Sequence, residues 1–136
     1  MDLLARREQS SKELFTKLKR RSEDEALINH VIKQLQQDAL QCDRRFSESY
    51  FRSLVNRGIG PVRIRNEFRA KGVAQDLVDE IFDAMSGDIN WFDMAEAIVT
   101  KKFGTLEFSD EKEKAKCLRF LAYRGFSSDI AYEIIF

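Results

Sequence analysis

Arginine and lysine side chains gather in one part of the sequence, and they are the residues best suited to bind an anion. Residues 44–72 contain eight basic and two acidic residues, whereas residues 73–98 contain seven acidic residues and no basic one. A guanidinium group donates two parallel hydrogen bonds to a carboxylate or a phosphate. Arginines spaced by four or seven residues share one face of a helix. We therefore expect a partner-binding surface made by Arg45, Arg52, Arg57, Arg63, Arg65, Arg69 and Lys71.

The same charge pattern has a second explanation that involves no partner. The chain as a whole has zero formal net charge, so the acidic segment 73–98 balances the basic segment before it. Pairs of exposed opposite charges stabilise a fold by about 0–1 kcal/mol each. Neutralisation of one helix by its neighbour therefore stays open beside the recognition of an anionic partner.

Residues for metal binding or nucleophilic catalysis are scarce. His30 is the only histidine, and Cys42 and Cys117 lie far from it in the sequence, without the short spacing of a zinc site. The six glycines are dispersed and form no phosphate-binding loop. We expect no enzyme activity and no cofactor or metal. His30 is expected at the surface or at its boundary, and both cysteines are expected to be reduced, buried thiols.

No segment approaches the roughly 18 apolar residues of a membrane span, and the N-terminal residues show no signal-peptide pattern. The sequence predicts a cytoplasmic protein that does not enter a membrane.

The apolar residues recur at intervals of three and four, which predicts an all-α fold. Ser10 with Glu13, and Ser22 with Glu25, have the spacing of helix-capping boxes. Gly58 is expected to end one helix, and Pro61 to begin the next after a tight corner. The predicted helices span about 2–20, 23–37, 43–57, 61–71, 74–86, 90–103, 109–124 and 127–135. Because the first begins almost at Met1, we expect no longer N-terminal arm.

The pattern of apolar residues repeats along the chain. An offset of 50 carries Leu14 and Leu18 onto Ile64 and Phe68, and a further offset of 53 carries Gly72 onto Gly125. We therefore predict tandem three-helix repeats at about 1–42, 43–88 and 89–136, forming an elongated, curved array. In the middle repeat, Gly58, Gly60, Pro61 and Gly72 are expected at the corners, and Ile64 and Phe68 in the core.

The middle repeat resembles the RecX family of recombinase regulators. The resemblance rests on Asp43, Arg45 and Phe46, followed by RGIGPVRIRNEFRAKGV at 57–73. LLARREQSSKELFTKL at 3–18 is similar to the first unit of that family, and FLAYRGFSSDIAYEII at 120–135 to the last. The segment before Asp43 reads QQDALQC, where the family usually places a glycine.

The resemblance implies a regulator that binds the RecA filament on single-stranded DNA and inhibits its ATPase, strand exchange and growth, in DNA repair, recombination and the SOS response. It implies a monomer whose basic residues contact acidic RecA surface, with possible weak contact to the single-stranded DNA. Two alternatives remain open. One is an autonomous nucleic-acid binding module, which would show a steep salt response. The other is a helical scaffold for an unrelated protein partner.

Overall fold

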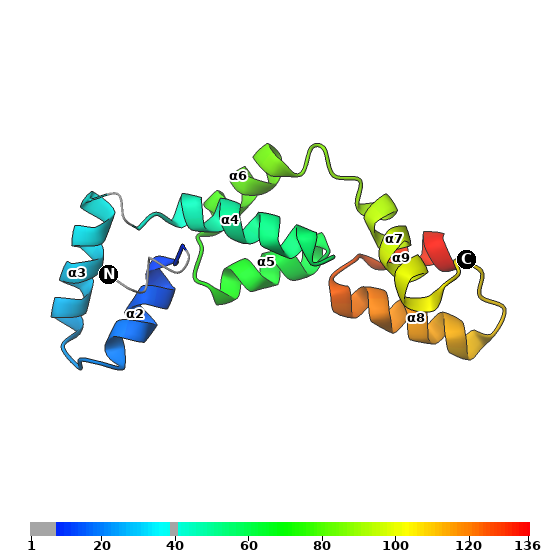
Figure 1. Ribbon diagram of the computed structural model, residues 1–136, viewed down its shortest axis with the longest axis horizontal. Helices are drawn as coiled ribbons and strands as arrows, with labels where there is room; N and C mark the ends of the chain where they lie inside the picture. Colours follow the sequence, from blue (N-terminus) through cyan, green and yellow to red (C-terminus); the bar gives the residue numbers. More distant parts are fainter. Residues whose placement is uncertain (1–7, 39–40) are drawn as a thin grey trace. The chain divides into compact units, whose positions relative to one another are not determined.

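The structure is a computed structural model, and it describes residues 8–38 and 41–136. Within these ranges every regular element is an α-helix, so the predicted all-α class is confirmed (Figure 1). The helices are α2 (Ser11–Lys19), α3 (Glu25–Gln37), α4 (Asp43–Asn56), α5 (Pro61–Ala70), α6 (Gln75–Met85), α7 (Trp91–Phe103), α8 (Glu111–Arg124) and α9 (Ser128–Ile135).

Two details of the predicted helix starts are wrong. Within the described residues the first helix does not extend back from Ser11, because Ser10 is extended and caps α2; the predicted part over residues 2–7 lies outside the described residues. The second helix is capped by Asp24 rather than by Ser22, since the Asp24 carboxylate accepts a hydrogen bond from the amide of Leu27. Asp at this position satisfies an unpaired helix amide as well as Ser does.

Two compact units divide the described chain between them. The first comprises the described residues up to Phe51 together with Glu67–Met85, and the second comprises Arg52–Asn66 and Ser86–Phe136. The boundary passes through α4 and α5, so both helices of the middle segment contribute to each unit.

The first unit has an aliphatic core and an aromatic core. Leu14 of α2 packs with Ile28, Ile32 and Leu35 of α3, and all four are buried because α2 and α3 turn their apolar stripes toward each other. Aromatic side chains from α4, α5 and α6 form the second core, in edge-on and stacked contacts typical of ring pairs. These contacts join Phe46 to Tyr50, Tyr50 to Phe68, and Phe51 to Phe82.

The second unit is built around the last three helices. Val99 of α7 and Cys117 and Leu121 of α8 are fully buried, and Ala131 and Ile135 of α9 close the same core. The chain reaches α9 through Gly125, whose φ of +97° is the left-handed conformation that ends a helix and favours glycine. Gly60, just before α5, lies so close to Gly125 that an added Cβ would be 2.5 Å from the Gly125 carbonyl oxygen. This contact places the start of α5 against the end of α8.

Candidate functional site

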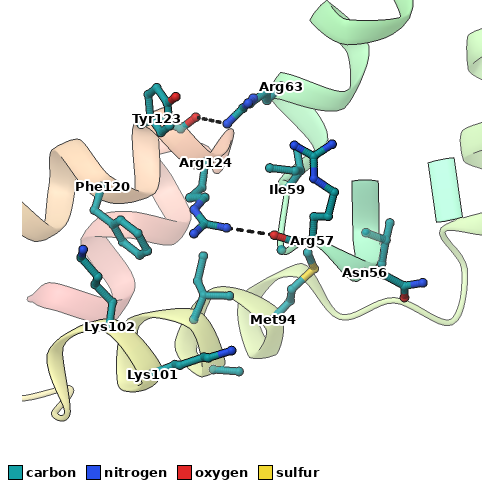
Figure 2. A pocket seen from close by; sticks show the side chains of 14 residues that line it. Asn56, Arg57, Ile59, Arg63, Met94, Lys101, Lys102, Phe120, Tyr123 and Arg124 are labelled. Atoms are coloured by element: carbon teal, nitrogen blue, oxygen red, sulfur yellow. Dashed lines mark hydrogen bonds between the residues drawn. The ribbon is translucent and has the colours of Figure 1, made fainter. Parts of the chain in front are cut away.

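A pocket of about 890 Å³ opens where several helices of the second unit end (Figure 2). The end of α4 and the corner after it supply one wall, the last turns of α7 a second, and the end of α8 a third. The side chains that carry charge are Arg57, Arg63, Lys101, Lys102 and Arg124. Among the described residues that line this pocket, none carries a carboxylate. The pocket is therefore strongly basic.

Cations at the ends of helices can also serve the helices themselves. Each helix C-terminus presents unpaired carbonyls with a partial charge of about −0.5, which nearby cations stabilise. Three such termini, those of α4, α7 and α8, offset about 1.5 of the five positive charges. The five cations therefore carry more positive charge than these three helix ends require.

The arginines of the pocket are held in place by backbone and ring contacts. Arg124 donates a hydrogen bond to the carbonyl of Arg57 at 2.9 Å, and its guanidinium lies 5.3 Å from the centroid of the Phe120 ring. Arg63 donates to the carbonyl of Tyr123 at 3.4 Å and lies 5.0 Å from the centre of that residue's ring (Figure 2). These carbonyl and ring contacts orient the two guanidinium groups at the pocket.

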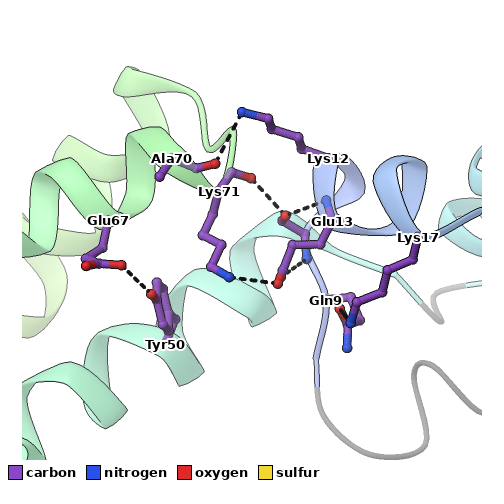
Figure 3. Close-up of polar contacts among 9 residues, drawn as sticks. Gln9, Lys12, Glu13, Lys17, Tyr50, Glu67, Ala70 and Lys71 are labelled. Carbon is purple, nitrogen blue, oxygen red and sulfur yellow. Dashed lines mark hydrogen bonds and ion pairs between the residues drawn. The ribbon is translucent and has the colours of Figure 1, made fainter. Parts of the chain in front are cut away.

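In the first unit the start of α2 meets the end of α5 (Figure 3), much as the start of α5 meets the end of α8 in the second unit. We call each of these two contacts a joint. Ser10 Oγ donates to the carbonyl of Lys71 at 2.8 Å, and Lys12 Nζ donates to the carbonyl of Ala70 at 3.2 Å. Lys71 Nζ forms an ion pair of 3.0 Å with Glu13, and it also lies 5.7 Å from the centre of the Tyr50 ring. In this joint the lysine at the end of α5 has an acidic partner.

Asp43, at the start of α4, ties that helix to the first unit. Its carboxylate accepts hydrogen bonds from the amide of Ser11 and from the side chain of Gln41, both at 2.9 Å. Asp43 therefore positions the helix that carries the first predicted arginines. In the middle repeat Phe46, Ile64 and Phe68 are buried, and Gly58 and Gly72 both have a φ of +76°.

The structure distributes the seven predicted basic residues over both units. Four belong to the second unit, and two of these, Arg57 and Arg63, line the basic pocket. The other two, Arg52 and Arg65, lie on α4 and α5 outside its described lining.

The remaining three predicted residues belong to the first unit. Arg45 lies 3.2 Å from Glu8 in an ion pair, Lys71 is paired with Glu13, and Arg69 is exposed. Neutralisation within the fold, the second explanation of the charge pattern, therefore applies to part of the set. It applies also to Arg44, which forms an ion pair with Glu80 of the acidic helix α6.

Three cationic residues that line the pocket were not predicted as site residues from the sequence, namely Lys101, Lys102 and Arg124. A signal for Arg124 was present, because the offset of 53 that carries Gly72 onto Gly125 also carries Lys71 onto Arg124. The lysines end α7, at a distance of more than 40 residues from Arg57, and only the packing of α7 beside the α4–α5 corner brings them to the same pocket.

The expected burial of both cysteines is wrong for Cys42, which is partly exposed. Cys117 is fully buried, and this burial raises the pKa of its thiol above the ordinary value. His30 is exposed, as predicted. In the described ranges no three His, Cys, Asp or Glu side chains converge as metal ligands. Within the same ranges none of the helices combines the length and hydrophobicity that crossing a bilayer requires.

Comparison with known proteins identifies the family. Models of the RecX family match the chain three times in succession: the first three-helix domain over residues 1–35, the second over 43–81 and the third over 88–135. The predicted tandem organisation in three-helix units is thereby confirmed.

Relatives and solved structures agree with these matches. Two proteins called "Regulatory protein RecX" are 39% identical to the chain. The protein from Halorhodospira halophila matches over 93% of this chain and 78% of its own length, and the protein from Haemophilus influenzae over 99% of this chain and 89% of its own length. A crystal structure of a regulatory protein RecX superimposes with a TM-score of 0.78 at 22% identity, over 98% of this chain and 66% of the other. RecX from Lactobacillus salivarius gives 0.76 at 23% identity, over 98% and 87%. The chain, with three consecutive RecX domains and this identity to its relatives, belongs to the RecX family of regulatory proteins.

Proposed function

We propose that this protein binds the filament that the RecA recombinase forms on single-stranded DNA, and that it inhibits the ATPase, strand exchange and filament growth of RecA in DNA repair and recombination. The observation that carries this proposal is the unbroken succession of three RecX domains along the chain. The action on RecA is what membership of this family implies. The proposal places the protein in the cytoplasm, as a monomer that regulates and catalyses no reaction.

The contacts with the filament are assigned to basic side chains of the middle segment. Arg52, Arg57 and Arg69 support this assignment best, because all three are exposed to solvent. Arg45 and Lys71 each have an acidic neighbour within the fold, so a contact from either to a partner would compete with an existing ion pair. The exposed arginines therefore come first in a mutational test.

The test is the DNA-dependent ATPase of RecA, measured with increasing amounts of the purified protein. Inhibition that saturates is the expected result. A variant with Arg52→Glu is expected to inhibit less, because a charge reversal at an interface opposes association. Lys116→Glu, at an exposed position of α8 outside the proposed surface, serves as the matched control. An ATPase that stays at full rate with the protein in excess would contradict the proposed function.

A further inference from the structure

The basic pocket of the second unit has an apolar lining as well as a charged one. Apolar side chains from α4, α7 and α8 form part of its wall, among them Val55, Met94, Ile98 and Phe120. Sites for small molecules are typically pockets of about 300–1,000 Å³ that combine an apolar lining with a few convergent polar groups. At about 890 Å³, this pocket has the size and the composition of a site for a single small molecule.

Four cations of the pocket point to a ligand with several negative charges. In the part of the chain that the structure describes, no carboxylate forms an ion pair with Arg57, Lys101, Lys102 or Arg124. Arg124 donates instead to the carbonyl of Arg57 at 2.9 Å. Since like charges repel one another, an anionic ligand that binds among these cations stabilises the folded state.

The origin of the cations indicates how the negative charges of the ligand are arranged. Arg57 follows α4, Lys101 and Lys102 lie in the last turn of α7, and Arg124 ends α8 (Figure 2). One carboxylate or one phosphate ion is too small to fill a pocket of this volume. A chain of linked phosphoryl groups presents oxygens along its whole length, and it can accept charge-assisted hydrogen bonds from several of these side chains at once.

An exposed aromatic ring of the lining indicates what the phosphoryl groups are attached to. The Tyr123 side chain is 73% exposed although it lines the pocket. A flat heterocyclic base that covers such a ring gains stacking energy and removes apolar surface from water. An inorganic polyphosphate would use the cations but not the ring, whereas a nucleotide uses both.

We propose that this pocket binds a nucleoside triphosphate, with Arg57, Lys101, Lys102 and Arg124 on the phosphoryl oxygens and the base on the Tyr123 ring. The ligand covers Arg57, which is one of the exposed arginines assigned above to the filament, and so it regulates that contact. This regulatory consequence rests on the proposed function, whereas the binding of the nucleotide does not. Binding is measured without recombinase, so the two proposals can fail separately.

The first experiment is isothermal titration calorimetry of the purified protein with ATP at low ionic strength. Saturable binding is expected. ATP is expected to bind about tenfold more tightly than AMP, or more, because AMP presents a single phosphoryl group to the cations. Heat without saturation, or equal affinities for ATP and AMP, would overturn the proposal.

Replacing both Lys101 and Lys102 by Gln removes two cations from the end of α7. Both side chains are exposed, so the melting temperature is expected to stay at the wild-type value. The affinity for ATP is expected to fall about tenfold or more. Lys116→Gln, at an exposed position of α8 outside the described lining, is the matched control and should bind ATP as the wild type does. Equal ATP affinity in the double variant and the control would overturn the site.

Tyr123→Leu separates recognition of the base from recognition of the phosphoryl groups. The wild type is expected to bind ATP about tenfold more tightly than inorganic tripolyphosphate, which has the charges but no base. The variant should lose this preference and keep its affinity for tripolyphosphate, because the ring contributes stacking and no charge. A wild type without the preference, or a variant that retains it, would overturn the choice of a nucleotide.

A competition experiment distinguishes the nucleotide from a macromolecular polyanion. Oligothymidine and poly-glutamate are added in turn to the protein saturated with ATP, each at the charge concentration of the nucleotide. Neither is expected to displace ATP, since the pocket has the volume of a site for one small molecule. Displacement by oligothymidine would reassign the pocket to a nucleic acid strand, and displacement by poly-glutamate would reassign it to an acidic protein segment. Either result would overturn the proposal.

Discussion

At the scale of single residues, two glycines of the second unit pack closely against each other. The carbonyl of Gly125 accepts a hydrogen bond from the amide of Val62 at 2.9 Å, which holds the oxygen against Gly60. A Cβ on Gly60 would lie 2.5 Å from this oxygen and 2.9 Å from a ring carbon of Phe126. Because the oxygen belongs to the backbone and is itself hydrogen-bonded, it cannot move aside as a flexible side chain could.

Gly60→Ala is therefore expected to reduce the free energy of unfolding by about 1–3 kcal/mol, the usual cost of overpacking. Urea denaturation followed by circular dichroism measures this change. Gly87→Ala is the matched control, because an added Cβ there meets nothing within 4 Å. A loss of the same size in both variants would show that the close approach of Gly60 to Gly125 is not the cause.

The two cysteines are expected to differ in their reactivity with a thiol reagent. Cys42 is partly exposed, whereas Cys117 is fully buried and has a raised thiol pKa. In the native protein Cys42 should react first, and Cys117 only as fast as the second unit opens. The predicted difference in reactivity is measured by mass spectrometry of the alkylated protein, and equal rates for both thiols would refute it.

Since the unfolded chain releases the Cys117 proton at a lower pH than the native protein does, the free energy of unfolding should fall as the pH rises above the ordinary pKa of 9.0. Urea denaturation at a series of pH values measures this fall.

At the scale of the helical element, the start of α2 does more than cap its own helix. Ser10 Oγ accepts from the amide of Glu13 at 3.1 Å while Glu13 accepts from the amide of Ser10 at 3.1 Å, which completes a capping box. The same hydroxyl donates to the carbonyl of Lys71, at the end of α5. One buried serine thus satisfies polar groups of two helices that are far apart in the sequence.

Ser10→Ala is expected to cost about 2 kcal/mol of unfolding free energy, the upper end of the range for a helix cap, because it also leaves the partly buried carbonyl of Lys71 without this donor. Ser127→Ala provides the comparison, since Ser127 caps α9 through a single bond of 3.4 Å to the amide of Ile130. Its cost should be about 0.5–1 kcal/mol. Thermal denaturation of both variants measures the difference, and equal losses would mean that the bond to α5 contributes nothing.

At the scale of the whole molecule, each of the two units has a buried core among the described residues. The core of α2 and α3 lies in the first unit, and the core of α7, α8 and α9 lies in the second. In repeat proteins such cores are coupled through neighbouring units only, so a local defect need not spread over the chain.

Leu121→Ala removes a fully buried side chain from the second core and should destabilise it by about 2–5 kcal/mol. Amide hydrogen exchange is expected to accelerate in α7, α8 and α9, with little change in α2 and α3. Leu14→Ala, in the first core, is the reciprocal variant and should give the opposite pattern. Equal acceleration in all helices after either substitution would show that the chain unfolds as one cooperative unit.

The sequence by itself determined the helices, because the spacing of apolar residues and the capping residues act within a few turns of the chain. Helix ends such as Asn56 before Gly58, and starts such as Pro61, follow from local conformational preferences alone. Asp24 took the cap predicted for Ser22 because two nearby residues had side chains able to cap, and the sequence contains no measure of which one wins.

Only the tertiary structure decided which charges act together. Arg57 and Arg63 were predicted on helical spacing, but their pocket neighbours Lys101, Lys102 and Arg124 come from α7 and α8, far from both along the sequence. Likewise, Lys71 and Arg124 occupy equivalent positions of the repeat. Lys71 forms an ion pair with Glu13, whereas Arg124 donates a hydrogen bond to the carbonyl of Arg57. Electrostatic attraction depends on distance in space, which a linear sequence does not report, and so the site emerged from the packing of the helices.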